Sequence, residues 1–172
     1  MTAPVFVDTS VFVYARDAGV PAKQRPALAW LDHLWRERRG RTSLQVLSEY
    51  YITVTRKLRP GLKPDVAWDD VTALFAWQPA AIDREIVSGA RDIEARYGLS
   101  WWDSLVVAAA KRQDCGLLLS EDLQEGGVYA GVTVRSPFTL HAGELDASYA
   151  VEAPSARRHP ARGRPTRARR RG

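Results

Sequence analysis

Hydrophobic positions follow two patterns along the chain, and each pattern predicts a different kind of element. Short, continuous apolar runs at residues 4–7, 116–119 and 131–134 are typical of buried strands. Elsewhere apolar residues recur every three or four positions, which is typical of helices with one buried face. The helices predicted in this way cover residues 9–16, 21–39, 44–58, 65–76, 83–98 and 100–114. Residues 41–43 and 80–82 are weaker candidates for strands. This order of elements predicts an α/β sandwich with a mostly parallel sheet.

Polar residues and glycines indicate where several of these helices begin and end. Thr9 or Ser10 is suited to cap the first helix, and Gly98 is suited to close the fifth. Ser100 begins the sixth helix with a pattern similar to a capping box. The third helix is expected to bury an apolar stripe formed by Leu44, Leu47, Tyr51, Val54 and Leu58.

The composition divides the chain into one domain and a tail. The full length of 172 residues suits a single domain with a complete core, which we place at residues 1–153. Residues 154–172 are rich in Pro, Arg, Ala and Gly, a composition that predicts disorder. Eight of the 25 basic residues lie in this tail, which leaves 17 against 20 acidic residues in the domain. The excess of positive charge therefore belongs to the tail, while the domain is mildly acidic.

The remaining bulk features favour a cytoplasmic protein. Cys115 is the only cysteine, so no internal disulfide forms, and its position between a helix and a strand predicts a small core residue. The apolar runs are too short to cross a bilayer, and the first residues lack the pattern of a signal peptide. We therefore expect no association with a membrane.

Four acidic residues stand where the predicted fold can bring them together. Asp8 ends the first strand, Glu49 lies on the third helix, Asp103 lies in the first turn of the sixth helix, and Asp122 follows the strand at residues 116–119. Ligands of parallel sheets gather at the carboxyl ends of the strands, so three of these acids are expected at one edge. Each acid also has a structural interpretation. Asp8 and Asp103 are favourable at helix N-termini, whereas Glu49 and Asp122 could simply be exposed to solvent.

A cluster of carboxylates predicts a site for a hard metal ion. Carboxylates that lie close together repel one another unless a cation neutralises them, and oxygen ligands favour Mg²⁺ or Mn²⁺. Such an ion polarises a phosphoryl oxygen and lowers the pKa of water, which is the chemistry of phosphoester hydrolysis. The three histidines lie far apart in the sequence, with no second cysteine, so a zinc site is not indicated. The chain also lacks a GxxxxGK[ST] phosphate-binding loop.

Four segments in this order resemble the motifs of the PIN-domain nucleases, and most closely those of VapC-type toxins from type II toxin–antitoxin systems. They are FVDTSVFVYA, SLQVLSEYY, WWDSLVVAAA and LLLSEDLQEGGVYAGVTVRSPF, and the resemblance covers about residues 4–138. It implies a three-layer α/β/α sandwich and an Mg²⁺- or Mn²⁺-dependent ribonuclease. The metal ligands and catalytic acids that it implies are Asp8, Asp103, Glu49 and Asp122, of which the first two match the firmest ligands. Ser10 and Ser120 match hydroxyl positions that support the acids. The resemblance also implies a small antitoxin as partner and a homodimer.

The leading hypothesis is therefore an endoribonuclease toxin, and other interpretations stay open. RNA phosphates require basic residues near the acids, and the candidates are Arg38, Arg39 and Arg41, and Arg56, Lys57 and Arg59. One alternative is a non-catalytic module that binds nucleic acid or a protein partner through the basic tail. Another is a PIN nuclease with a role other than that of a toxin. A small-molecule phosphatase is disfavoured, because Asp8-Thr9-Ser10 lacks the second Asp of a DxDxT motif.

Overall fold

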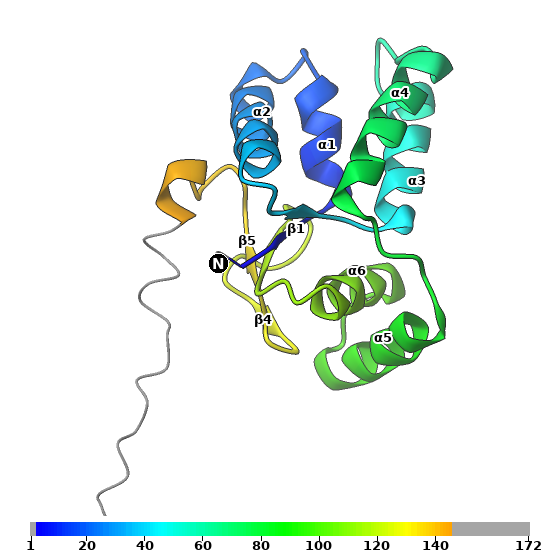
Figure 1. Ribbon diagram of the computed structural model, residues 1–172, viewed down its shortest axis with the longest axis vertical. Helices are drawn as coiled ribbons and strands as arrows, with labels where there is room; N and C mark the ends of the chain where they lie inside the picture. The colour runs from blue at the N-terminus through cyan, green and yellow to red at the C-terminus, as the bar shows by residue number, and fades with distance from the viewer. Residues whose placement is uncertain (1–2, 146–172) are drawn as a thin grey trace, which may run out of the picture.

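A five-stranded sheet lies between two layers of helices in the computed structural model, which describes residues 3–145 (Figure 1). The strands are β1 (Val5–Val7), β2 (Gly40–Arg41), β3 (Leu117–Leu119), β4 (Val128–Tyr129) and β5 (Val132–Arg135), in the order β2-β1-β3-β5-β4. The domain end predicted at residue 153 and the tail predicted at residues 154–172 lie outside the described residues.

The pairing of the central strands places their carboxyl ends level with one another. β1 pairs in parallel with β2 and β3, and β3 pairs in parallel with β5. Val7 lies opposite Leu119, and these are the last residues of β1 and β3. The residues that follow them, Asp8 and Ser120, therefore begin side by side at one edge of the sheet.

Helices cover both faces of the sheet, so the predicted three-layer α/β/α sandwich is confirmed (Figure 1). One layer holds α1 (Thr9–Arg16), α2 (Pro21–Arg36), α3 (Leu44–Ile52) and α4 (Pro64–Leu74). The other holds α5 (Arg84–Tyr97) and α6 (Trp101–Arg112), which pack against each other. Shorter turns are a π-helical turn η1 (Thr53–Lys57) and the 3₁₀ turns η2 (Phe75–Trp77) and η3 (Ala142–Glu144). No helix within residues 3–145 combines the length and apolar character needed to cross a membrane.

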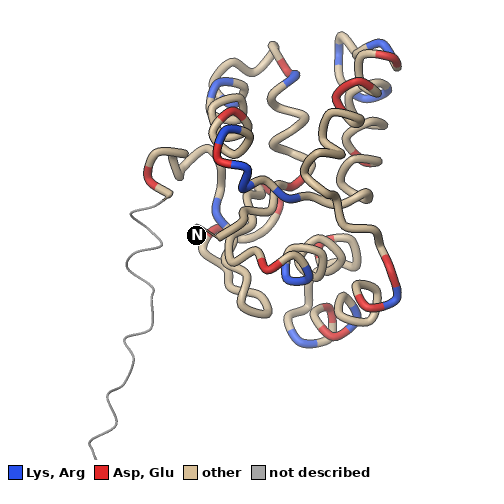
Figure 2. The backbone as a smooth tube through the Cα atoms, in the orientation of Figure 1, with Lys and Arg blue, Asp and Glu red and all other residues tan. Residues whose placement is uncertain are grey.

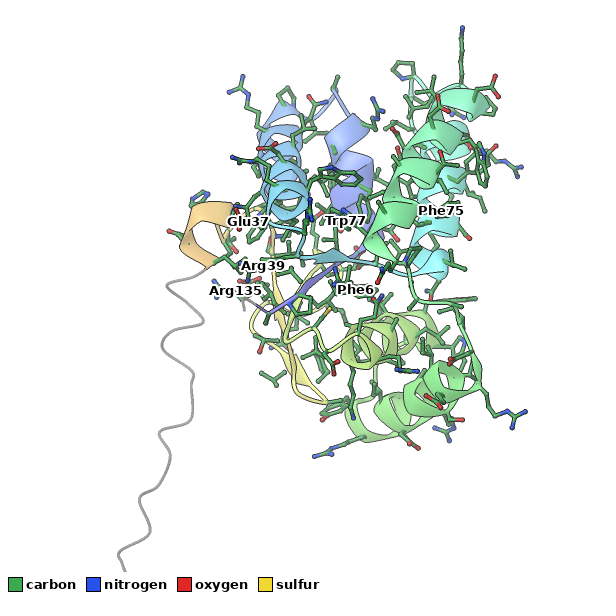
Figure 3. The ribbon with its side chains drawn as sticks, viewed as in Figure 1. Phe6, Glu37, Arg39, Phe75, Trp77 and Arg135 are labelled. Atoms are coloured by element: carbon green, nitrogen blue, oxygen red, sulfur yellow. The ribbon has the colours of Figure 1, made fainter. Side chains whose placement is uncertain are left out.

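The core consists of the central strands and the inner faces of the helices. All residues of β1 and β3 are buried, as their continuous apolar runs predict. Trp77 lies between the helical layer and the sheet (Figure 3), where its ring packs against Phe12 and contacts Gly40. Trp30 is also buried and donates its Nε1–H to the carbonyl oxygens of Pro137 and Leu140, which fixes the segment after β5 against α2.

Several boundaries differ from those that the sequence predicts. Helix 44–58 divides into α3 and the π-helical turn η1, and helix 21–39 ends at Arg36. The strand expected at 41–43 is β2 at residues 40–41, whereas of residues 80–82 only Ala80 forms a single bridge, to Ser43. β4, which the sequence did not predict, runs antiparallel to β5 and is only two residues long. Cys115 is buried in the core as expected, and burial raises the pKa of its thiol to about 12.

Candidate functional site

Asp8 is the most buried of the four acids, and hydrogen bonds of its backbone N–H and of both its carboxylate oxygens hold it in place. It follows β1, and its backbone N–H donates to the carbonyl oxygen of Leu119 on β3. Its Oδ1 accepts the backbone N–H of Thr9 at 2.7 Å, so Asp8, and not Thr9 or Ser10, is the N-cap of α1. Its Oδ2 accepts the hydroxyl of Ser120 at 2.7 Å. Only 5% of Asp8 is exposed, so its carboxyl group is fixed in place by the sheet edge.

The environment of Asp8 disfavours its charged form. Burial is the largest cause and raises the pKa of Asp8 from its ordinary value of 3.8 to about 6. The hydrogen bonds from Ser120 and Thr9 oppose this rise in pKa, because they stabilise the carboxylate. The negative charges of Asp122 and Glu49 raise the pKa further. A carboxylate in such a place is stabilised by any cation that binds beside it.

Glu49 points toward Asp8 and does not lie on a solvated face of α3. Its Oε2 accepts the hydroxyl of Thr9 at 3.0 Å, and its Oε1 accepts the side-chain amide of Gln45 at 2.9 Å. Thr9 therefore connects the two acids, since its backbone N–H binds Asp8 and its hydroxyl binds Glu49. The sequence indicated Thr9 only as a helix cap and gave Gln45 no role, so neither was predicted to hold an acid of the site. Gln45 lies four residues before Glu49, a helical spacing at which side chains meet, and this was the available signal.

Asp103 lies in the first turn of α6, where it takes part in the cap of that helix. Ser100 is the N-cap, and its hydroxyl accepts the backbone N–H of Asp103 at 3.1 Å. The same hydroxyl donates to Oδ2 of Asp103 at 2.6 Å. Asp103 thus lies at a helix N-terminus, as its structural interpretation predicts. Its Oδ1 accepts no hydrogen bond from the described residues, so this atom is available to a ligand from outside the helix.

Asp122 lies in the exposed loop after β3, on the same side as the other acids. Its backbone N–H donates to the hydroxyl of Ser120 at 3.2 Å, so Ser120 contacts both Asp8 and the Asp122 backbone. Desolvation is the largest cause that raises the pKa of Asp122. The charges of Glu121, Asp103 and Glu49 raise this pKa as well, whereas Lys23 lowers it. Asp122 therefore lies close enough to Glu49 and Asp103 for their charges to affect its pKa, and its own charge affects the pKa of Asp8.

The four carboxylates do not form a closed set of metal ligands. Within residues 3–145, no group of three or more His, Cys, Asp or Glu side chains is arranged to hold a metal ion. Asp8 and Glu49 each have both carboxylate oxygens hydrogen-bonded to protein donors, which fixes the orientation of the two carboxylates.

The donor chemistry of the site nevertheless fits a hard divalent cation. The candidate ligands are carboxylate oxygens, which favour Mg²⁺ or Mn²⁺. The pKa values of Asp8 and Asp122 are raised chiefly by burial and further by neighbouring acids, and a bound cation would offset both effects. The hydroxyl of Ser10 is buried and has no hydrogen-bond partner among the described residues, although it lines the same region. A buried polar group in that state requires a water or a ligand atom as partner.

A groove of about 450 Å³ is lined by Glu49 and Asp122, together with Glu121, and we call it the acidic groove. It runs between α1 and the segment formed by α3 and η1, and the loop after β3 borders it. Its lining residues are Thr9, Ser10, Val13, Tyr14, Glu49, Ile52, Thr53, Lys57, Glu121 and Asp122.

The basic residues predicted to assist RNA binding occupy different environments. Lys and Arg positions are spread over both helical layers of the described chain (Figure 2). Arg39 is buried and donates its Nε–H to the carbonyl oxygen of Ala3, and Arg41 donates to the carbonyl oxygen of Gly40. Arg39 is therefore unsuited to contact RNA, and the prediction for it is wrong. Among the six candidates, Lys57 is the one that lines the acidic groove.

Comparison with known proteins identifies the fold. The PIN domain family model matches residues 5–124. The crystal structure of VapC20 from Mycobacterium tuberculosis, described as a toxin that cleaves the sarcin-ricin loop, superposes with a TM-score of 0.56 and 21% sequence identity. This similarity covers 75% of the present chain and 98% of the VapC20 chain, and at this identity it concerns the fold. No curated protein is similar enough in sequence to count as a match. Because the family model spans more than half of the sequence, including all four acids, the chain belongs to the PIN-domain family.

Proposed function

We propose that the protein is a metal-dependent endoribonuclease that hydrolyses RNA phosphodiester bonds and acts as the toxin of a toxin–antitoxin pair. The proposal is supported chiefly by the PIN family model, which spans all four acids, together with the hydrogen bonds that join Asp8 and Glu49 through Thr9 and Asp8 to Ser120 at the sheet edge. The raised pKa values of Asp8 and Asp122 also favour a cation there, because burial and, to a smaller extent, the neighbouring acids disfavour the charged carboxylates.

The four acids and two hydroxyls have distinct roles in this proposal. Asp8 and Asp103 would hold an Mg²⁺ or Mn²⁺ ion, which supplies charge neutralisation at the phosphate and activation of water when bound. Glu49 and Asp122 complete the acidic cluster and position the attacking water. Ser120 orients Asp8 through its hydrogen bond to Oδ2. Ser10 offers a hydroxyl with no protein partner among the described residues, which suits it to orient water or a substrate oxygen.

The partners proposed here follow from the similarity to VapC toxins. RNA is the substrate, a small antitoxin protein is the partner that blocks the acidic groove, and the active form is a homodimer in the cytoplasm. VapC20 is described as cleaving the sarcin-ricin loop, so an RNA hairpin of that sequence is a reasonable first substrate to test beside an unstructured RNA.

The proposal is tested with purified protein and labelled RNA in Mg²⁺, in Mn²⁺ and in EDTA. Cleavage is expected with either metal and is expected to stop in EDTA. Asp8→Asn and Asp103→Asn are each expected to reduce cleavage at least about hundredfold, because each removes charge from a metal ligand. Asp92→Asn is the matched control, since Asp92 is exposed on α5 and lies away from the acidic groove.

Two results would contradict the assignment. Cleavage that persists unchanged in both active-site variants would remove Asp8 and Asp103 from the mechanism. RNA binding without metal-dependent cleavage in the wild type would favour the alternative of a non-catalytic module that acts through its basic tail.

A further inference from the structure

Lys57 stands out among the cations because it lies in the acidic groove without an acidic partner. Among the described residues that line the groove, it is the one Lys or Arg. Its side chain is exposed, and no ion pair within residues 3–145 involves it. Lys23 at the same mouth differs, because it pairs with the carboxylate of Glu121 and lies over the ring of Tyr14.

The π-helical turn explains why Lys57 faces the acids. Lys57 follows Glu49 by eight residues, and in a regular α-helix it would be rotated about 80° away from Glu49. In η1 the backbone N–H of Leu58 instead donates to the carbonyl oxygen of Thr53, five residues earlier, at 2.9 Å. This wider turn advances each residue through a smaller angle, which brings Lys57 back toward the face of Glu49.

The spacing along the helix keeps Lys57 apart from the carboxylates. Eight residues of helix correspond to at most about 12 Å along the axis, so the backbone positions of Lys57 and Glu49 lie at different levels of the groove. The groove therefore carries negative charge near the sheet edge and one positive charge further along α3 and η1. A polyanion that approaches the acids is attracted by the positive charge of Lys57.

We propose that Lys57 binds a phosphate of single-stranded RNA next to the phosphate that is cleaved, and so aligns the strand along α3 and η1. The choice of RNA as ligand rests on the proposed function. A groove of about 450 Å³ has the size of a small-ligand site, which suits a short segment of one strand. Because Lys57 forms no ion pair within residues 3–145, its ammonium group can bind a phosphate without first breaking one.

The experiment measures RNA binding by the full chain in EDTA, where no metal-dependent cleavage occurs. The probe is a short fluorescein-labelled single-stranded RNA of mixed sequence, followed by anisotropy over a range of salt concentrations. Lys57→Gln is expected to weaken binding about tenfold and to lower the salt slope of log Kd by about 0.7. Lys57→Arg should restore both values. Lys63→Gln is the matched control, since Lys63 is exposed and does not line the groove.

The outcomes separate this inference from the proposed function. If Lys57→Gln binds RNA with the same Kd and salt slope as Lys63→Gln, or if the wild type binds no RNA, the inference is overturned. If the wild type binds but does not cleave RNA in Mn²⁺, the nuclease proposal fails while a selective loss in Lys57→Gln still supports the phosphate site. Where cleavage occurs, Lys57→Gln should raise KM and leave kcat within about twofold, because the contact is remote from the reacting bond.

Discussion

At the level of single residues, Asp8 shows that a structural role and a chemical role are compatible. The sequence left capping and metal binding as alternatives for this residue, and the structure shows that its Oδ1 caps α1. The same carboxyl group faces Glu49 and Asp122. Asp103 likewise takes part in the cap of α6. Residue type and position therefore predicted where these acids lie, whereas their hydrogen-bond partners depend on contacts between distant segments.

The raised pKa of Asp8 predicts how the stability of the metal-free protein depends on pH. The folded state binds a proton at Asp8 with a pKa of about 6, whereas the ordinary value is 3.8. Since the folded state holds this proton more tightly, the free energy of unfolding falls as pH rises between these values. The decrease due to Asp8 is at most about 3 kcal/mol.

Urea denaturation in EDTA at a series of pH values measures this effect. Asp8→Asn is the reference, because Asn also caps helices but does not titrate. The wild type should lose more stability than the variant over this range, and added Mn²⁺ should reduce the difference. Parallel curves for the two proteins would contradict the pKa assigned to Asp8.

Gln45 is the positioning residue that the structure adds to the predicted site. Its amide holds Oε1 of Glu49, so Gln45→Ala leaves that oxygen without its protein donor. We expect kcat/KM for RNA cleavage to fall about tenfold to hundredfold, as is found when residues that orient metal-site ligands are removed. The apparent affinity for Mn²⁺, measured by titration, should fall as well.

Ser48→Ala is the control for Gln45→Ala. Ser48 is exposed on the same helix, and its hydroxyl donates to the carbonyl oxygen of Leu44. Equal activity and equal Mn²⁺ dependence of the two variants would show that Gln45 does not position Glu49.

At the level of helices and strands, apolar periodicity predicted the elements better than it predicted their inner faces. The expected stripe is confirmed at Leu47 and Val54, which are buried, and is wrong at Leu44, of which 41% is exposed. The stripe also omits Val46 and Tyr50, which are buried on α3. This helix carries apolar residues on more than one side, so the pattern alone does not decide which side meets the sheet. The π-helical turn and the two-residue β4 depend on tertiary contacts and left no readable pattern.

Gly40 in β2 gives a test of packing between elements. A Cβ atom at this position would lie 2.5 Å from ring carbons of Trp77, closer than real contacts allow. Trp77 is enclosed by Phe12 and Trp35, so its ring has little room to move. We therefore expect Gly40→Ala to lower the free energy of unfolding by about 1–3 kcal/mol, measured by urea denaturation.

Gly143→Ala is the matched control for this substitution. A Cβ atom on Gly143 would meet nothing within 4 Å, so this variant should keep the stability of the wild type. Equal stability of the two variants would mean that the contact between Gly40 and Trp77 is not tight.

At the level of the whole molecule, the fold could be predicted because its main elements are encoded in order along the chain. The buried runs at β1 and β3 and the acids that follow them placed the site at one edge of a parallel sheet. The groove was beyond prediction, because it depends on how α1 packs beside α3 and η1. Charge also matters at this scale, because the domain is mildly acidic and carries an acidic site. RNA is therefore attracted by local cations such as Lys57 and by the arginines at residues 157–171.

The most direct test of metal-dependent hydrolysis at these acids is a reversal experiment on one RNA substrate. Cleavage by the wild type is followed in Mn²⁺, after addition of EDTA, and after Mn²⁺ is restored in excess, with Asp103→Asn in parallel. If the acids bind the catalytic metal, wild-type cleavage stops and then resumes, while the variant remains at least about hundredfold slower whenever Mn²⁺ is present. Cleavage that continues in EDTA, or equal rates for the two proteins, would contradict this role of the acids.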